Sequence, residues 1–174
     1  MIITKPSLAD LPILTEMARK TLWESHGHSA AVEDMESYLN GKVTQEALLA
    51  ELLDERNSFY WIHHEGRLAG YSKIMLDCPL EIIPAKNVTK LERLYLLQDF
   101  HGLKLGQELF EHNIQLSKAA NQAGMYLYVW KGNHRAIAFY LKNGFKIIGE
   151  GLFKLSERHS NPNHIMFLGM KNEG

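Results

Sequence analysis

Hydrophobic residues recur at helical spacing over the first third of the chain and predict two or three helices there. One helix is expected to begin after Ser7, which forms a capping-box pattern with Asp10, and to fade near Trp23. A short helix is expected over residues 32–39, ended by the Asn-Gly pair that follows. A third is expected to begin at Thr44, a residue type that favours the N-cap position.

The hydrophobic period changes to two in the middle of the chain, which predicts strands. Residues 58–64 alternate around aromatic side chains, residues 65–66 form a Glu-Gly turn, and residues 68–77 return as a second strand. These three segments predict a β-hairpin. Residues 1–5 and 90–97 are predicted as two further strands.

The second half of the chain alternates helices with strands. Its long helix is expected to present one narrow polar stripe to water and to bury the rest of its surface. The shorter helix is expected to end at an Asn-Gly pair, and a polar loop to separate the last two strands. The predicted elements are a helix over 103–121, a strand over 125–130, a helix over 133–142, strands over 145–149 and 164–170, and a loop over 156–163.

This order of elements predicts a mixed α/β (α+β) layer architecture. The hairpin requires antiparallel pairing, whereas the strand–helix–strand unit over residues 91–130 requires a parallel crossover. A length of 174 residues suits one domain with its own core, so we expect a single domain over residues 1–174.

Composition and charge exclude several classes of protein. Hydrophobic residues make up 45% and charged residues 22%, as is typical of a soluble globular protein. A net charge of −1 provides no basic surface for nucleic acid or membrane lipid. Cys78 is the only cysteine, so no intrachain disulfide can form, and the N-terminus lacks the pattern of a secretory signal. We therefore expect a cytoplasmic protein without a nucleic-acid or membrane partner.

The turn over residues 101–106 lies between a predicted buried strand and a helix, and it contains Gly102 and Gly106. The first amides of a helix lack partners and lie at the positive end of its dipole, so this geometry suits a phosphate. Taken alone, two glycines near a helix start favour a plain tight turn over a ligand site. The pattern is neither a P-loop nor a dinucleotide-binding fingerprint.

The segments around this turn resemble the GNAT family of N-acetyltransferases. Residues 91–96 are similar to the family's central strand, and residues 101–106 match its Gln/Arg-x-x-Gly-x-Gly/Ala turn. Residues 133–140, followed by the Asn-Gly-Phe of 143–145, match its Asn-x-x-Ala-x-x-Phe-Tyr…Gly-Phe signature. The resemblance covers nearly the whole chain. It implies a mixed, mostly antiparallel central sheet of six to seven strands flanked by about four helices.

Two residues of the turn depart from the family pattern. His101 stands where the family has Gln or Arg, and Lys104 replaces the middle glycine. Lys104 loses a flexible position but places a cation beside the expected pyrophosphate. It also begins the polar stripe of the long helix, and the two roles are compatible.

The resemblance implies acetyl-CoA as the acetyl donor, with coenzyme A as product. The exposed edge of the central strand is expected to hold the pantetheine arm through its backbone, as an added strand would be held. Asn133 equally suits a plain N-cap, and it can serve both roles. The residues expected to bind the cofactor are Leu94, Tyr95, Leu96, His101, Gly102, Leu103, Lys104, Leu105, Gly106, Gln107, Asn133, Ala136, Phe139 and Tyr140.

Acetyl transfer requires a neutral amine, a donor to the oxyanion and a proton for the departing thiolate. Tyr140 stands at the family's general-acid position, and a tyrosine with an ordinary pKa of about 10 stays protonated at neutral pH. A core aromatic is the alternative role for Tyr140. Glu92 is similar in position to the family's common glutamate and is the candidate base; the alternative is a strand carboxylate paired with Arg93 or Lys90. The nine histidines lack zinc-site spacing, so no metal site is predicted.

Residues 21–53, the strand over 126–130 and the helix over 136–140 most resemble, within the family, bacterial spermidine/spermine acetyltransferases. This resemblance implies a primary amine acceptor such as a polyamine. Trp23, Glu33 and Trp130 are the residues expected to contact this substrate. The acidic residues near Glu33 equally suit a solvated helix face. A protein, peptide or antibiotic-like amine as acceptor and a non-catalytic coenzyme A-binding module are the alternatives. The sequence leaves open whether the protein is a monomer or a homodimer.

Overall fold

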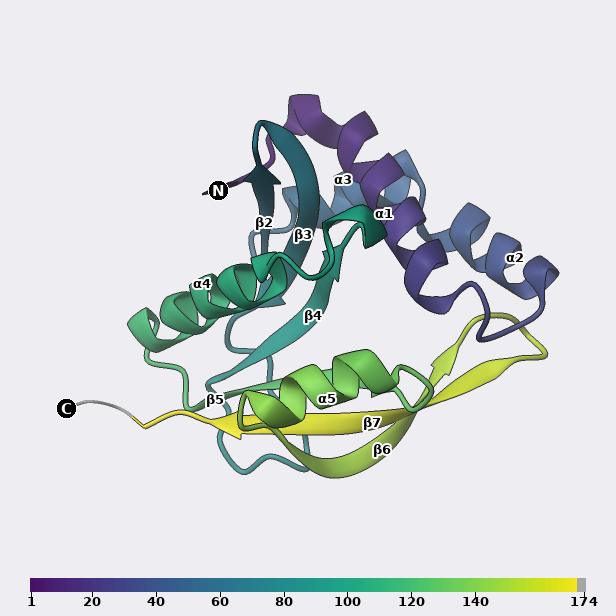
Figure 1. Ribbon diagram of the computed structural model, residues 1–174. Helices are drawn as coiled ribbons and strands as arrows, with labels where there is room; N and C mark the ends of the chain where they lie inside the picture. The colour runs from purple at the N-terminus through teal and green to yellow at the C-terminus, as the bar shows by residue number, and fades with distance from the viewer. Residues whose placement is uncertain (172–174) are drawn as a thin grey trace.

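The computed structural model describes residues 1–171, which form a seven-stranded sheet with helices on both faces (Figure 1). The strands lie in the order β1-β2-β3-β4-β5-β7-β6, and all neighbours pair antiparallel except β4 and β5. The predicted mixed architecture with a mostly antiparallel sheet is therefore confirmed. The strands are β1 (Ile2–Thr4), β2 (Asn57–His64), β3 (Arg67–Met75), β4 (Val88–Leu96), β5 (Gly124–Trp130), β6 (Lys146–Lys154) and β7 (Ser160–Gly169).

Five α-helices and two 3₁₀ turns complete the described part of the chain. The first three α-helices pack in one hydrophobic cluster with the aromatic side chains of β2 and β3, on one face of the sheet. The fourth and fifth cover the other face (Figure 1). The elements are η1 (Leu8–Asp10), α1 (Leu11–His26), α2 (Val32–Lys42), α3 (Gln45–Leu53), η2 (Gln98–Phe100), α4 (Leu105–Ala119) and α5 (His134–Lys142). None of these helices combines the length and apolar character needed to cross a membrane.

The predicted helix starts are confirmed, and two helix ends lie later than predicted. The Ser7 amide donates to the Asp10 carboxylate at 2.7 Å, and Thr44 accepts from the Ala47 amide at 3.1 Å. Helix α1 continues past Trp23 to His26. Helix α2 runs through its Asn-Gly pair to Lys42, because a Gly in a helix costs only about 1 kcal/mol, which tertiary packing offsets.

The parallel pairing of β4 with β5 covers three residues, Val88–Lys90, and the two strands then diverge (Figure 1). The reason lies on the other side of β4. Its register against β3 passes from Lys73 opposite Arg93 to Ile74 opposite Leu91, so Glu92 is an extra, unopposed residue. Such a bulge bends its strand. The rest of β4, beyond Lys90, is consequently left without a strand partner on its β5 side within residues 1–171.

The last two strands are longer than predicted. Residues 160–163, expected in a polar loop, form the start of β7 and pair with β6. Asn161 and Asn163 are buried in this segment. The turn between the strands is tied to α2, since Asp34 accepts from the Ser156 hydroxyl at 2.7 Å and from Arg158 at 2.9 Å. These polar contacts hold the β6–β7 hairpin against α2. Because they join residues far apart in the sequence, no local pattern predicts them.

Candidate active site

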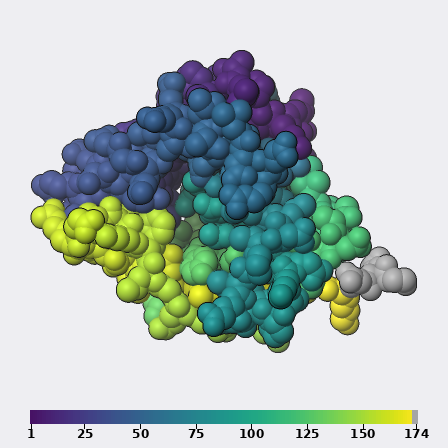
Figure 2. All heavy atoms as spheres, turned by 180° about the vertical axis from the view of Figure 1, so that it is seen from behind, coloured from purple at the N-terminus to yellow at the C-terminus, as the bar shows by residue number. Residues whose placement is uncertain are grey.

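A cavity of about 500 Å³ occupies the opening between β4 and β5. Its walls come from the end of α1, from β4 and β5, from α5 and from the β6–β7 hairpin. From behind, the surface is hollowed between the yellow-green β6–β7 hairpin and the blue and teal segments of the N-terminal half (Figure 2). The cavity therefore exists because the bulge at Glu92 parts the two central strands.

The free edge of β4 offers backbone groups to this cavity. The carbonyl of Leu96 faces the open side, because it contacts the His101 imidazole at 3.2 Å. Groups two residues apart in a strand point the same way, so the amide and carbonyl of Leu94 face the opening too. This confirms that the strand has an exposed edge at the two residues that were predicted to hold an extended ligand.

The turn before α4 has two residues in the left-handed region. Gly102 has φ of 85° and Lys104 has φ of 62°, which explains why a glycine suits the position that Lys104 fills. The first amides of α4 precede its first hydrogen bond, donated by Glu108 to the Lys104 carbonyl at 3.2 Å. At Gly106 an added Cβ would make only an ordinary contact, 3.5 Å from the Leu96 side chain. Packing within the protein does not require glycine there, whereas close approach of a phosphate would.

Replacing Gly102 by alanine is expected to lower the free energy of unfolding by about 1–2 kcal/mol. No atom lies within 4 Å of the added Cβ, so the cost is backbone strain alone. Urea unfolding measures it, and the KM for acetyl-CoA should rise as the turn shifts. Lys104→Gly is the matched control, because it relieves the same strain and should lose no stability from this source. Equal destabilisation by both substitutions would contradict this account.

His101 and Arg135 meet at the mouth of the cavity. The His101 ring donates from Nε2 to Leu96 and contacts the Arg135 guanidinium through Nδ1. Since a guanidinium only donates, His101 Nδ1 is the acceptor and the ring is the neutral Nε2–H tautomer. With exposed Lys104 nearby in the turn, the mouth gathers two permanent cations, Lys104 and Arg135, at the positive end of α4.

The structure brings most of the predicted cofactor residues together around the cavity. Leu103 and Lys104 are exposed outside it, and Leu105 is buried beneath the turn against β2 and β3. Gln107 is hydrogen-bonded to Asn143, and Gly102 also lies outside the lining. The predicted residues that line the cavity are Leu94, Tyr95, Leu96, His101, Gly106, Asn133, Ala136, Phe139 and Tyr140.

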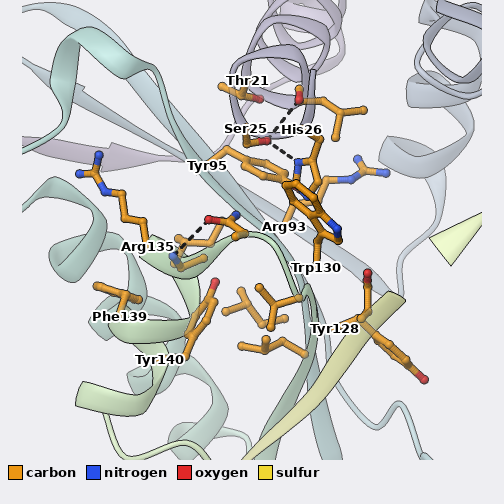
Figure 3. Close-up of a pocket in the computed structure, with 18 of the residues that line it drawn as sticks. Thr21, Ser25, His26, Arg93, Tyr95, Tyr128, Trp130, Arg135, Phe139 and Tyr140 are labelled. Atoms are coloured by element: carbon orange, nitrogen blue, oxygen red, sulfur yellow. Dashed lines mark hydrogen bonds between the residues drawn. The ribbon is translucent and has the colours of Figure 1, made fainter. Parts of the chain in front are cut away.

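Tyr140 lies on α5 with its hydroxyl directed into the cavity (Figure 3). Asn133 caps this helix, its side chain accepting from the Ala136 amide at 3.2 Å, so the predicted N-cap is confirmed. The Tyr140 ring packs against Phe139 and Phe145, with ring centroids 5.3 and 5.4 Å away. Burial raises the pKa of Tyr140 above its ordinary value, which keeps the hydroxyl protonated at neutral pH.

Glu92 lines the cavity and belongs to a chain of ion pairs. Lys73, only 4% exposed, lies 3.0 Å from the Glu92 carboxylate and donates to Glu51 at 2.6 Å. Arg93 donates to both oxygens of Glu51, at 2.7 and 3.1 Å. Burial disfavours the Glu51 anion, but Arg93 and Lys73 outweigh it, so the pKa of Glu51 lies below its ordinary value. The predicted pairing of Glu92 with Arg93 is present at 3.9 Å, and the second cation is Lys73 and not Lys90.

Of the three predicted substrate contacts, the structure places only Trp130 at the cavity. Trp23 is 40% exposed, on another face of α1 beside Arg19 and Leu39. Glu33 is exposed on the first turn of α2, outside the cavity lining. Helix α1 extends three residues beyond Trp23, and its last turn lines the cavity. Because successive residues point in different directions around a helix, Trp23 faces away from that side.

Several cavity residues were missed from the sequence. The end of α1 contributes Ser25 and His26, and β7 contributes Asn161 and Asn163. Glu24, one of the acidic residues weighed for the acceptor site from the sequence, also lines the cavity. The His26 ring lies 6.3 Å from Tyr95 of β4 and 5.9 Å from Trp130 of β5 between centroids, so it bridges the two diverging strands (Figure 3). His26 and His28 lie two positions apart in the sequence, but this spacing is not that of a zinc site and pointed to no other role. The two asparagines gave no signal because they were assigned to a loop.

Comparison with known proteins agrees with this geometry. The family model of the acetyltransferase (GNAT) family matches residues 16–145. An uncharacterized N-acetyltransferase of Lactobacillus delbrueckii subsp. lactis is 28% identical over 155 residues, covering 89% of this chain and 90% of the relative. Spermidine N(1)-acetyltransferase of Thermoplasma acidophilum is 28% identical over 149 residues, covering 83% and 88%.

A solved structure shares the fold. PaiA N-acetyltransferase of Thermoplasma acidophilum in complex with coenzyme A superposes with a TM-score of 0.77 at 24% identity, covering 97% of this chain and 98% of that one. The parted strands, the turn before α4 and the matching family model lead to one conclusion. The chain belongs to the GNAT family of acetyltransferases, and it is an N-acetyltransferase that uses acetyl-CoA.

Proposed function

We propose that the protein acetylates a primary amine of a small polyamine, with Tyr140 as general acid. The observation that carries the proposal is the single cavity between β4 and β5, which joins the turn before α4 to the end of α1. Tyr140 opens into this cavity from α5. An acyl donor held along β4 and an amine entering beneath α1 would meet at this hydroxyl.

The residues around the cavity fit acetyl-CoA. Acetyl-CoA supplies an acetyl thioester, which an amine attacks with release of the thiolate. The backbone of Leu94 and Leu96 would hold the pantetheine arm, and the amides at the start of α4 would hold the pyrophosphate. Lys104 and Arg135 would add positive charge there. Asn133, Ala136 and Phe139 form the wall on the α5 side.

Tyr140 would protonate the departing thiolate. Its hydroxyl is buried and protonated at neutral pH, and it makes no hydrogen bond to any residue from 1 to 171 that would divert the proton. Glu92 would receive the proton of the acceptor ammonium, through water. The ion pair with Lys73 holds the Glu92 carboxylate at the cavity wall. A carboxylate held in place beside the opening is suited to this task.

Two carboxylates line the cavity, those of Glu24 and Glu92, and they support a cationic acceptor. Glu24 accepts from the Gln98 amide at 3.2 Å through Oε2, while its Oε1 is shielded from solvent and has no donor among the described residues. Three cations also line the cavity. Arg93 pairs with Glu51 and Glu92, Lys90 lies over the Tyr128 ring at 5.4 Å, and Arg135 contacts His101 at the mouth. The relative named spermidine N(1)-acetyltransferase supports the same class of substrate.

The test is an acetyl-transfer assay with spermidine, spermine, n-butylamine and peptide N-termini as acceptors. A higher kcat/KM for spermidine and spermine than for the other acceptors would support the proposal. Preferential turnover of peptides would contradict the polyamine assignment. Thermal stabilisation by acetyl-CoA without turnover of any amine would contradict the proposed reaction and favour a binding module.

Glu24→Gln is expected to raise the KM for spermidine about tenfold, because a hydrogen bond to a charged group contributes about 1.5–3 kcal/mol. The glutamine keeps an oxygen for the Gln98 amide, so only the charge is removed. The KM for n-butylamine, which has no second ammonium, should change less. Glu33→Gln is the control, since that side chain is exposed on α2. Equal changes for both amines would contradict a charge-selecting role.

A further inference from the structure

The cavity wall beneath α1 joins three residues from distant parts of the chain. His26 ends α1, Trp130 ends β5, and Asn163 of β7 is the cross-strand partner of Trp130. Cross-strand partners project their side chains on the same face of a sheet. The three side chains therefore adjoin, and all line the cavity.

Ser25 contacts both the α1 backbone and the His26 ring. Its Oγ lies 3.2 Å from the Leu22 carbonyl and 2.6 Å from His26 Nδ1 (Figure 3). When the hydroxyl gives its only proton to the Leu22 carbonyl, its oxygen accepts from Nδ1–H. His26 Nε2 then presents a bare lone pair, and no residue from 1 to 171 hydrogen-bonds to it.

The His26 ring is uncharged at neutral pH. Burial, reinforced by the neighbouring His28, lowers the pKa of His26 to about 4. A neutral imidazole in this tautomer accepts a hydrogen bond at Nε2 and does not repel an ammonium group. If the ring were protonated, Nε2 would donate a hydrogen bond, and the positive charge of the ring would repel an ammonium group.

Asn163 supplies a second unused polar group. The residue is 7% exposed, and its Oδ1 has no donor within the described residues. Asn161, two positions earlier, differs, because it donates to Ser29 at 2.8 Å and contacts His159 at 2.8 Å. Asn163 Oδ1 is shielded from solvent, and rotation of the Asn163 amide would exchange the positions of its oxygen and nitrogen at the cavity wall. A donor bound in the cavity would supply the missing partner.

We propose that His26 Nε2 and Asn163 Oδ1 form the subsite that holds the N–H groups of the acceptor amine beside Trp130. This inference rests on the proposed function and assigns the specificity for N–H donors to residues far apart in sequence. Two acceptor atoms discriminate in favour of primary amines, because an alcohol offers one hydrogen and a tertiary amine in its neutral form offers none. Trp130 would pack against the carbon chain next to the amine.

The tautomer is tested without any substrate. Long-range ¹H–¹⁵N correlation NMR of the histidine-labelled protein near pH 7, with Ser25→Ala and His26→Gln to assign the signals, should show His26 neutral with hydrogen on Nδ1. The Nε2–H tautomer, or a charged ring, would overturn the proposal.

The kinetic test compares variants that remove an acceptor with variants that keep one. The probe is the amine with the highest kcat/KM among spermidine, spermine and n-butylamine. Asn163→Leu and His26→Phe should each raise the KM for this amine about tenfold and leave the KM for acetyl-CoA within twofold. Asn163→Asp and His26→Gln retain an acceptor atom and should recover most of the loss. Thermal unfolding of all four variants monitors folding.

The outcomes separate this inference from the proposed function. If the wild-type protein acetylates the probe amine but the two acceptor-removing variants keep its KM, this inference alone is overturned. If the KM for the amine and the KM for acetyl-CoA rise together, the two residues maintain the fold and do not bind the amine. That result would also overturn the inference. If the wild-type protein acetylates no amine, the proposed function fails and this inference fails with it.

Discussion

Tyr140→Phe is expected to lower kcat by about 10²–10⁴-fold at neutral pH, the range that a positioned general acid contributes. The substitution removes only the hydroxyl, which is directed into the cavity. The ring keeps its packing against Phe139 and Phe145, so the KM for acetyl-CoA and the thermal stability should change little. Steady-state kinetics with varied amine and acetyl-CoA measure the separate effects.

Tyr128→Phe is the matched control. Tyr128 also lines the cavity, but it is 39% exposed on β5 and its side chain points away from Tyr140 (Figure 3). Removal of its hydroxyl should therefore leave kcat within about twofold, because this group does not face the proposed general acid. A Tyr140→Phe variant with near-normal kcat would remove Tyr140 from the mechanism and leave it the role of a core aromatic.

Lys73→Met is expected to lower the free energy of unfolding by about 3–5 kcal/mol, the cost of removing one partner from a buried ion pair. Lys73 is 4% exposed and lies between the carboxylates of Glu51 and Glu92. Methionine fills a similar volume but leaves Arg93 as the only cation near the two anions within the described structure. For a domain of this size, each kcal/mol lowers Tm by about 2–4 °C.

Urea unfolding and thermal melts measure this loss, and Lys131→Met is the control. Lys131 lies 2.6 Å from Glu150, but the two side chains are 33% and 70% exposed. An exposed pair of this kind contributes little to the free energy of unfolding, because water and salt screen it. A similar loss of unfolding free energy in both variants would show that water screens the ion pairs of Lys73 with Glu51 and Glu92. Lys73→Met should also reduce kcat if Glu92 receives the proton, because Lys73 holds that carboxylate in place.

Local patterns allowed most of the elements of this protein to be predicted from sequence. Thr44 and Asn133 mark helix starts because their side chains accept from amides three residues on, and Asp10 accepts from the Ser7 amide in the same local way. None of these bonds requires a distant partner. The alternation of β2 and β3 and the amphipathic pattern of α4 were equally local. The turn before α4 was found for the same reason, although its left-handed Lys104 became clear only from the backbone angles.

Long-range packing decided the rest. The bulge that leaves Glu92 unopposed parts β4 from β5 and creates the cavity, and strand register depends on pairing between segments that are distant in sequence. The cavity wall beneath α1 brings His26 together with Asn163, which is far away in the sequence. No local sequence pattern could therefore predict that the two residues lie close together. Helix phase at the end of α1 turned Trp23 outward and Glu24 inward. The sequence by itself determined most of the elements, the resemblance to the family and the glycine turn before α4, whereas the tertiary structure decided which side chains line the cavity.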